Sequence, residues 1–284
     1  MTSVSKWIAG ARPRTLPAAI APVLVATAYA GSNWAPLRAL SALLVSLALQ
    51  IGVNYANDYS DGILGTDDLR IGPVRLTASG LATPKSVRTA AIISFLFAAL
   101  IGLTLAAATS WWIILVGALA INAAWGYTGG SNPYGYKGLG EISVFLFFGV
   151  VATVGTYYVQ TEELNLRILI ISIPMGALAC AILAINNLRD RAQDEIVGKK
   201  TLAVRLGDKG ARRLYVALLL SAHLFALFTF EPGALLTLLA APLTWNLARD
   251  VLSGVHGADL IPYLAKTGKL QLVFALLFAL GLVI

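Results

Sequence analysis

Two groups of acidic and amide side chains are the residues of this 284-residue chain best suited to chemistry. One lies in the stretch N-Y-A-N-D-Y-S-D and the other in N-N-L-R-D-R-A-Q-D. Their members are Asn54, Asp58, Asp61, Asn186, Asp190 and Asp194. Spacings of three and four residues place each group on one helical face, at the end of a long apolar run. Ionised carboxylates at the edge of a bilayer core cost at least about 3 kcal/mol each, so both groups need a partner, and a divalent cation suits them.

The ligand types and the nearby bases narrow that chemistry. No His or Cys accompanies the acids, and Mg²⁺ in proteins binds through one or two carboxylates plus phosphate oxygens of the substrate. Bases follow or surround both groups, namely Arg70, Arg75, Arg191, Lys199 and Lys200. Acids that hold a metal beside bases that hold phosphate would make diphosphate a good leaving group. Basic residues after an apolar helix are also expected from membrane topology alone, and we interpret Asp67 and Asp68 as loop residues.

The composition indicates the elements that must position these residues. Hydrophobic residues make up 58% of the chain and charged residues 12%, against about 25% charged in a soluble domain. The mean hydropathy is +0.77. We therefore expect an all-α polytopic membrane protein, with residues 1–284 forming one domain around a central cavity. Nine segments are long enough to span the bilayer, at 16–32, 38–57, 87–108, 110–127, 139–159, 167–188, 212–230, 233–249 and 269–284.

The distribution of basic residues predicts the orientation. If the N-terminus is cytoplasmic, one set of loops holds all of the 21 Lys and Arg residues except Arg38 and Arg167. This is a strong positive-inside signal, so both acidic groups and the mouth of the cavity are expected to face the cytoplasm, in a multi-pass protein of the cell membrane. The net charge is +7, and the basic residues responsible for it lie in short loops beside anionic headgroups. Membrane lipids are thus expected partners, and nucleic acid is not.

Three further features bear on the site. The pair Asn54 and Asp58 has the same spacing as Asn186 and Asp190, which indicates two half-bundles that each bring an acidic face to one cavity. The single cysteine, Cys180, excludes an intrachain disulfide. The Gly-rich stretch 129–140 has no phosphate-loop spacing and suits a turn or a cap over substrate.

The acidic motifs also resemble a known family. Together with G-K-K-T-L-A-V-R-L-G at 198–207, they are similar to those of the UbiA-type intramembrane aromatic prenyltransferases, over nearly the whole chain. The stretches 7–17, 70–75 and 127–141 resemble the menaquinone branch, the 1,4-dihydroxy-2-naphthoate polyprenyltransferases. The first motif departs from the superfamily pattern, because its acids, Asp58 and Asp61, are three residues apart instead of four.

The resemblance implies a reaction and a metal site. A polyprenyl diphosphate would bind through Mg²⁺ and lose diphosphate to leave an allylic cation. The ring of an aromatic acid, 1,4-dihydroxy-2-naphthoate, would then attack, and loss of CO₂ would give demethylmenaquinol. An apolar interior that excludes water would protect the cation. The metal ligands implied are Asp58, Asp61, Asp190 and Asp194.

The expected substrate-binding residues are Arg14, Arg70, Arg75, Lys137, Arg191 and Lys199. Arg14 is the candidate for the aromatic carboxylate, because a planar guanidinium binds a carboxylate through two parallel hydrogen bonds. Asn54 and Asn186 are expected to orient metal or substrate, and Tyr127 to stabilise the cation or the departing oxygen. Each also has a structural interpretation, as a topogenic charge, a helix-interface amide or an interfacial tyrosine.

Two alternatives remain open from the sequence. The acceptor could be another aromatic acid, such as 4-hydroxybenzoate. A cation-coupled membrane transporter would also carry intramembrane acids and Pro-broken helices. It would differ by solute uptake without release of diphosphate.

Overall fold

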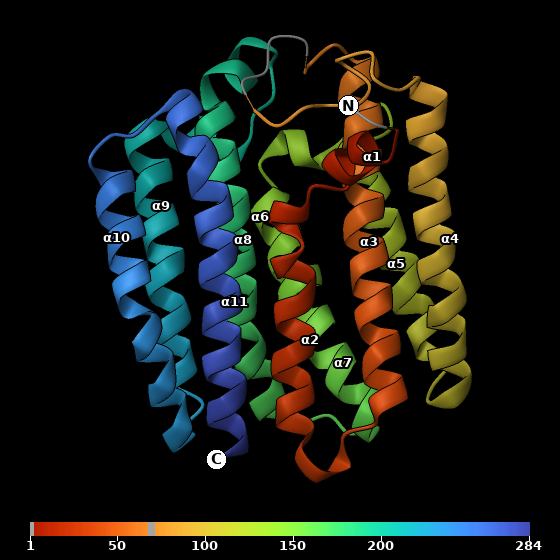
Figure 1. The fold of residues 1–284 in the computed structure, drawn as a ribbon, viewed down its shortest axis with the longest axis vertical. Helices are drawn as coiled ribbons and strands as arrows, with labels where there is room; N and C mark the ends of the chain where they lie inside the picture. Colours follow the sequence, from red (N-terminus) through yellow and green to blue (C-terminus); the bar gives the residue numbers. More distant parts are fainter. Residues whose placement is uncertain (1–2, 68–71) are drawn as a thin grey trace.

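The computed structural model describes residues 3–67 and 72–284, which fold as a helical bundle without strands in those ranges (Figure 1). Within a helix the backbone N–H and C=O groups bond to one another, as a hydrocarbon environment requires. Short 3₁₀ turns connect several of them, and a π-helix, Phe145–Val151, joins α6 to α7. The α-helices are α1 Ser3–Ala11, α2 Pro17–Ala30, α3 Pro36–Ile63, α4 Pro84–Ala108, α5 Trp112–Gly126, α6 Gly140–Val144, α7 Ala152–Thr161, α8 Leu166–Ile196, α9 Leu202–Leu227, α10 Ala241–Leu252 and α11 Ile261–Val283.

Six stretches of the described residues are long and apolar enough to cross a membrane. They are α3, α4, α8, α9, the continuous unit from α6 to α7, and α11 with the turn before it. A seventh is counted if α1 and α2, which bend by 54° at their junction, form one span. The 15 residues of α5 reach only about 22 Å, which is less than a hydrocarbon core of about 30 Å. The multi-pass helical class is thus confirmed, while six or seven spans satisfy these criteria against nine expected.

Local sequence fixes the helix ends beside the polar end of the bundle. Pro84 opens α4 at a first-turn position, where its missing N–H costs nothing. Thr201 starts α9 by accepting the N–H of Val204. Gly207 has a positive φ of 67° and kinks α9. The cap of α9 thus fixes the short turn that joins α8 to α9.

The core lies around α8, the most buried of the apolar spans. Its residues Ile171, Met175 and Ile185 pack in one cluster with side chains of α2, α9 and α11. Gly149 of the π-helix lies against Gly176 of α8 so closely that a Cβ on Gly149 would be 2.5 Å from the Gly176 Cα. Small residues allow such backbone contact in membrane bundles. This contact anchors the π-helix to the core.

Both acidic motifs lie at one end of the bundle. The last turns of α3 and α8 reach the end where α1 and the N-terminus lie, and the C-terminus lies at the opposite end (Figure 1). A cavity lined by residues of both helices connects them. The fold therefore brings together two motifs that are more than 120 residues apart in the chain.

Candidate active site

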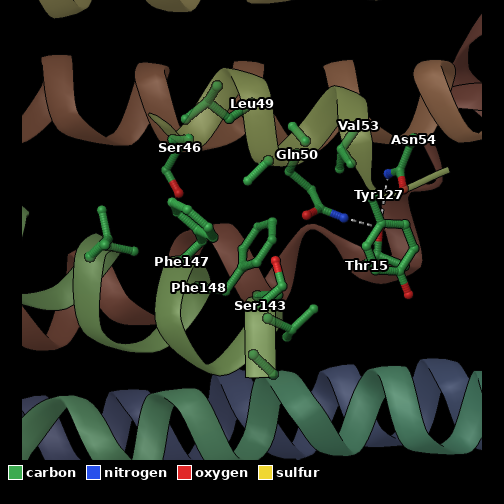
Figure 2. A pocket seen from close by; sticks show the side chains of 18 of the residues that line it. Thr15, Ser46, Leu49, Gln50, Val53, Asn54, Tyr127, Ser143, Phe147 and Phe148 are labelled. Carbon is green, nitrogen blue, oxygen red and sulfur yellow. Dashed lines mark hydrogen bonds between the residues drawn. The ribbon is translucent and has the colours of Figure 1, made fainter. Parts of the chain in front are cut away.

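A cavity of about 1050 Å³ lies between α3, α4, α5, α8 and the unit from α6 to α7. Its deeper part is apolar, with Phe147 and Phe148 reaching from the π-helix toward Ser46 and Leu49 of α3 (Figure 2). Its polar end is lined by Asp61, Asp67, Arg75, Asp190, Asp194 and Lys199. This size exceeds the roughly 300 to 1,000 Å³ of common ligand sites, so the cavity has room for more than a small metabolite.

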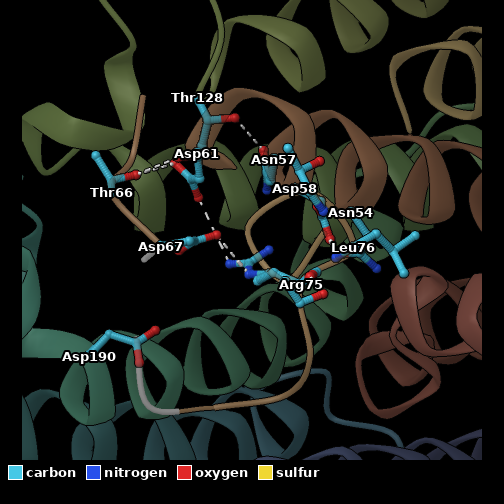
Figure 3. A network of polar contacts seen from close by, with 12 residues as sticks. Asn54, Asn57, Asp58, Asp61, Thr66, Asp67, Arg75, Leu76, Thr128 and Asp190 are labelled. Atoms are coloured by element: carbon cyan, nitrogen blue, oxygen red, sulfur yellow. Dashed lines mark hydrogen bonds and ion pairs between the residues drawn. The ribbon is translucent and has the colours of Figure 1, made fainter. Parts of the chain in front are cut away.

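Ion pairs join three elements at the polar end. The Arg75 Nε lies 2.9 Å from the Asp67 Oδ2, and the Arg75 Nη2 lies 3.8 Å from the Asp61 Oδ2 (Figure 3). The Lys199 Nζ lies 3.0 Å from the Asp61 Oδ1. All four side chains are buried. Lys199 belongs to the turn after α8, so its contact with Asp61 connects the first motif to the segment that follows the second.

Tyr136 belongs to the same network, although the sequence did not single it out. Its hydroxyl donates a hydrogen bond of 2.6 Å to the Asp61 Oδ1, and the Lys199 ammonium lies 4.6 Å from its ring centroid. Burial, followed by the neighbouring Asp61 carboxylate, raises the pKa of the Tyr136 hydroxyl above its ordinary value. Tyr136 therefore remains a donor at neutral pH. The Gly-rich stretch was the available signal, but the expected base beside it, Lys137, is exposed and does not line the cavity.

The second motif lines the cavity as expected, with an unexpected partner. Asp190 and Asp194 both face the cavity from α8, and Asn186 lies one turn earlier. Arg189 donates two hydrogen bonds of 2.7 Å to Asp190, from Nε to Oδ1 and from Nη2 to Oδ2. The same Nη2 donates to the Asn186 Oδ1 at 2.7 Å. Arg191, expected to bind substrate, instead pairs with a glutamate on its own helix and does not line the cavity.

The first motif presents a different face than expected. Asp58 does not line the cavity, because its Oδ2 accepts the N–H of Leu76 at 2.8 Å and its Oδ1 accepts the N–H of Thr77 at 2.9 Å. Asn57 lines the cavity in its place, and the Thr128 hydroxyl donates to its Oδ1 at 2.8 Å. Asp67, interpreted as an ordinary loop residue, is buried in the ion-pair network described above. Of the acids in and after the first motif, Asp61 and Asp67 line the cavity, whereas Asp58, expected from the sequence to hold a metal, faces the backbone of residues 76 and 77.

Three of the remaining expected residues, Asn54, Arg14 and Tyr127, also line the cavity. Asn54 lines the cavity, and its Nδ2 donates to the Ala11 carbonyl at 2.9 Å and to the Thr15 hydroxyl at 3.1 Å. These bonds tether the turn that carries Arg14, an exposed residue that also lines the cavity. Tyr127 lines the cavity at the end of α5 (Figure 2). Arg70 lies outside the described residues.

The carboxylates of this end fit Mg²⁺ by ligand type but do not form a finished metal cage. No group of three or more His, Cys, Asp or Glu side chains within residues 3–67 and 72–284 is arranged to hold a metal ion. Asp61 and Asp67 on one side, and Asp190 and Asp194 on the other, line a single cavity. This suits Mg²⁺, which is commonly held by one or two carboxylates and completed by phosphate oxygens and water.

Comparison with known families then decides the class. The model of the UbiA prenyltransferase family matches residues 19–255. The chain belongs to the UbiA prenyltransferase family. It is 52% identical over 283 residues to the 1,4-dihydroxy-2-naphthoate octaprenyltransferase of Mycobacterium tuberculosis, covering 98% of this chain and 97% of that one. It is 41% identical to the Escherichia coli protein of the same name, over 97% and 94% of the two chains.

Solved structures of the family share the fold. A UbiA homologue from Aeropyrum pernix superposes with a TM-score of 0.72 at 15% identity, over 94% of this chain and 96% of that one. The homologue from Archaeoglobus fulgidus bound to GPP and Mg²⁺ gives 0.70 at 15% identity, over 98% and 99%. These structures support the fold, while the family model and the full-length relatives confirm the resemblance drawn from the sequence motifs. The protein is a multi-pass membrane prenyltransferase.

Proposed function

We propose that the protein transfers a polyprenyl group from polyprenyl diphosphate to 1,4-dihydroxy-2-naphthoate, with loss of CO₂ and diphosphate, to give demethylmenaquinol. Full-length similarity to relatives of that activity carries the proposal. The cavity supports it, because acids and bases gather at one end and apolar side chains line the other.

The polar end is suited to a metal-bound diphosphate. Asp61, Asp67, Asp190 and Asp194 would hold Mg²⁺, which when bound supplies positive charge to the departing oxygens. Arg75 and Lys199 lie among these acids and would exchange their carboxylate partners for phosphate oxygens. Arg189 keeps Asp190 in one orientation through its paired hydrogen bonds. Tyr136 does the same for Asp61.

The apolar part of the cavity is suited to the prenyl tail. Gly102, Gly117 and Gly155 line it, and a Cβ on any of them would have no atom within 4 Å apart from its chain neighbours and the backbone of its own helix. α5 packs on α3 and α4, and every one of its residues is at least partly exposed. A long tail would lie in this space and continue toward the bilayer. The same apolar walls keep water from the allylic cation, which water would convert to a prenol.

The aromatic acid would bind nearer the rim. Arg14 offers a guanidinium there for the carboxylate, held by the turn that Asn54 tethers. Tyr127 lies deeper, with its ring edge-on to Tyr134 at 5.5 Å between centroids, and would stabilise charge near the reacting carbon. The ring would then lie between the rim and the ion-pair network.

The topology completes the proposal. Nine segments would cross the cell membrane as a single domain of residues 1–284, including the short α5 and the unit of a 3₁₀ turn and α10 at 232–252. The end that carries the acids would face the cytoplasm, because nearly all Lys and Arg residues lie in the loops of that side.

A reconstitution assay tests the function. Purified protein, Mg²⁺, a polyprenyl diphosphate and a panel of aromatic acids are incubated, and the products are identified by mass. We expect prenylated product from dihydroxynaphthoate, release of ¹⁴CO₂ from its carboxyl-labelled form in step with diphosphate, and no turnover in EDTA. Product from 4-hydroxybenzoate alone, or product that retains the label, would contradict the acceptor. Solute uptake by vesicles without diphosphate release would contradict the enzyme class.

A further inference from the structure

Asp58 is a fully buried carboxylate that faces the backbone of a distant segment. It lies near the end of α3, and its two oxygens accept the consecutive N–H groups of Leu76 and Thr77 at 2.8 and 2.9 Å. Hydrogen bonds to an ionised acceptor are about twice as strong as neutral ones. Asp58 therefore binds the backbone of residues 72–82, which we call the strap, to the side of α3.

Further contacts fasten the strap at the same place. Leu76 is fully buried, and a Cβ on Gly10 of α1 would lie 2.6 Å from its Cδ1. A Cβ on Gly62 of α3 would lie 2.5 Å from the side chain of Thr77. The Lys6 ammonium donates to the Leu81 carbonyl at 2.9 Å. The strap is thus held between α1 and α3, and the carboxylate of Asp58 supplies the polar part of that attachment.

The residue that immediately precedes this attachment is Arg75. Its guanidinium reaches Asp67 at 2.9 Å and Asp61 at 3.8 Å. The N–H bound by Asp58 is that of the next residue, so the bond fixes the peptide group between positions 75 and 76. The position of an arginine guanidinium depends on the position of its backbone, so a shift of the backbone moves the charge.

We propose that Asp58 is a positioning residue that holds the strap so that Arg75 meets the acids and, in the enzyme, the diphosphate. The proposal rests on the proposed function for the identity of the ligand. It replaces the metal-ligand role expected for Asp58 from the sequence. The two roles differ in what a substitution changes, because loss of a metal ligand changes the Mg²⁺ requirement, whereas displacement of Arg75 changes the KM for prenyl diphosphate.

A double-mutant cycle tests the role. Asp58→Ala should raise the KM for polyprenyl diphosphate at least about tenfold, while the Mg²⁺ concentration for half-maximal activity stays within about twofold of that of the unmodified protein. Asp58→Asn keeps one acceptor oxygen and should give a smaller rise. Arg75→Ala should have the larger effect, and the double variant should equal Arg75→Ala within about twofold, because residues acting through one group are not additive.

Two variants calibrate these measurements. Asp61→Asn should raise the Mg²⁺ requirement and shows what loss of a metal ligand looks like. Asp208→Ala is the matched control, since its carboxylate also holds a partner, Arg212, through two hydrogen bonds but does not line the cavity. It should leave both kinetic constants unchanged. A raised Mg²⁺ requirement in Asp58→Ala, or effects of Asp58→Ala and Arg75→Ala that multiply in the double variant, would overturn the proposal.

A second measurement does not depend on turnover. A nitroxide is attached to a Val74→Cys variant in a Cys180→Ala background, and its mobility is recorded with and without Asp58→Asn. We expect greater mobility in Asp58→Asn, recorded at a temperature well below the thermal midpoint of each variant. Unchanged mobility would refute the strap attachment even if prenyl transfer is established, and greater mobility would support it even if the acceptor or the reaction proves different.

Discussion

The sharpest consequence of the site geometry is the expected effect of Asp67→Asn. The Asp67 and Arg75 side chains are only 2% and 8% exposed and lie 2.9 Å apart. Two unit charges at this distance attract by about 6 kcal/mol at an effective dielectric constant of about 20. After desolvation, breaking a buried pair by removing one charge costs about 3 to 5 kcal/mol. Asparagine keeps one acceptor for Arg75, so we expect a loss of stability at the lower end of that range.

The effect on activity should be larger than the effect on stability. Asp67→Asn removes one charge that would hold Mg²⁺, and it weakens the ion pair that fixes the position of the Arg75 guanidinium. The kcat/KM should therefore fall about 10²-fold to 10³-fold. Activity is measured in detergent at a temperature well below the thermal midpoint of each variant. Asp259→Asn, at an exposed position outside the cavity, is the control and should be neutral. Activity of Asp67→Asn within about threefold of the unmodified protein would refute the place of Asp67 in the site.

Three other predictions follow from the cavity and the topology. Arg14→Lys keeps the charge but loses the planar fork, so the KM for the aromatic acid should rise more than that for prenyl diphosphate in steady-state kinetics; equal rises would contradict the assignment. Gly155→Trp should lower turnover of a long prenyl diphosphate at least about tenfold more than turnover of geranyl diphosphate; an equal loss would place the tail elsewhere. In a Cys180→Ala background, Lys137→Cys should be labelled from the cytoplasm and Glu163→Cys from outside; labelling of both from one side would contradict the orientation.

The sequence was sufficient to predict the helical elements that build the cavity. Each expected segment overlaps a helix, and errors at the ends are explained by local contacts. The segment expected at 212–230 begins at Leu202 in the structure, because the Thr201 cap starts the helix before the kink at Gly207. The type of element is less ambiguous than its ends, because a long apolar segment that spans a membrane must be helical.

The register of the first motif could not be read from the sequence. Asn54 and Asp58 have the same four-residue spacing as Asn57 and Asp61, so α3 offers two overlapping faces with similar chemistry. The N–H groups of Leu76 and Thr77 in the strap donate to Asp58, so this carboxylate faces the strap and the face with Asn57 and Asp61 lines the cavity. That contact joins residues 18 and 19 positions apart through a loop, which helical periodicity does not predict.

The second motif was predicted correctly in position, yet its partner was overlooked. A basic residue next to Asp190 normally points to another face of a helix, and Arg191 does so. Arg189 bends back onto Asp190 instead, because a buried acid and a buried guanidinium satisfy each other at the helix surface. Tyr136 was missed for a similar reason, since only the fold brings its loop to Asp61.

The ion pairs between Asp61, Lys199, Asp67 and Arg75 also bear on how a catalytic cycle ends. Arg75 and Lys199, which would hold diphosphate, already have carboxylate partners beside them. When diphosphate leaves, their positive charges would therefore still be compensated. Free diphosphate lacks the apolar tail that adds to the binding of the substrate. Loss of the tail would therefore weaken binding of the product relative to the substrate, and the acids would pair with the bases again as diphosphate leaves.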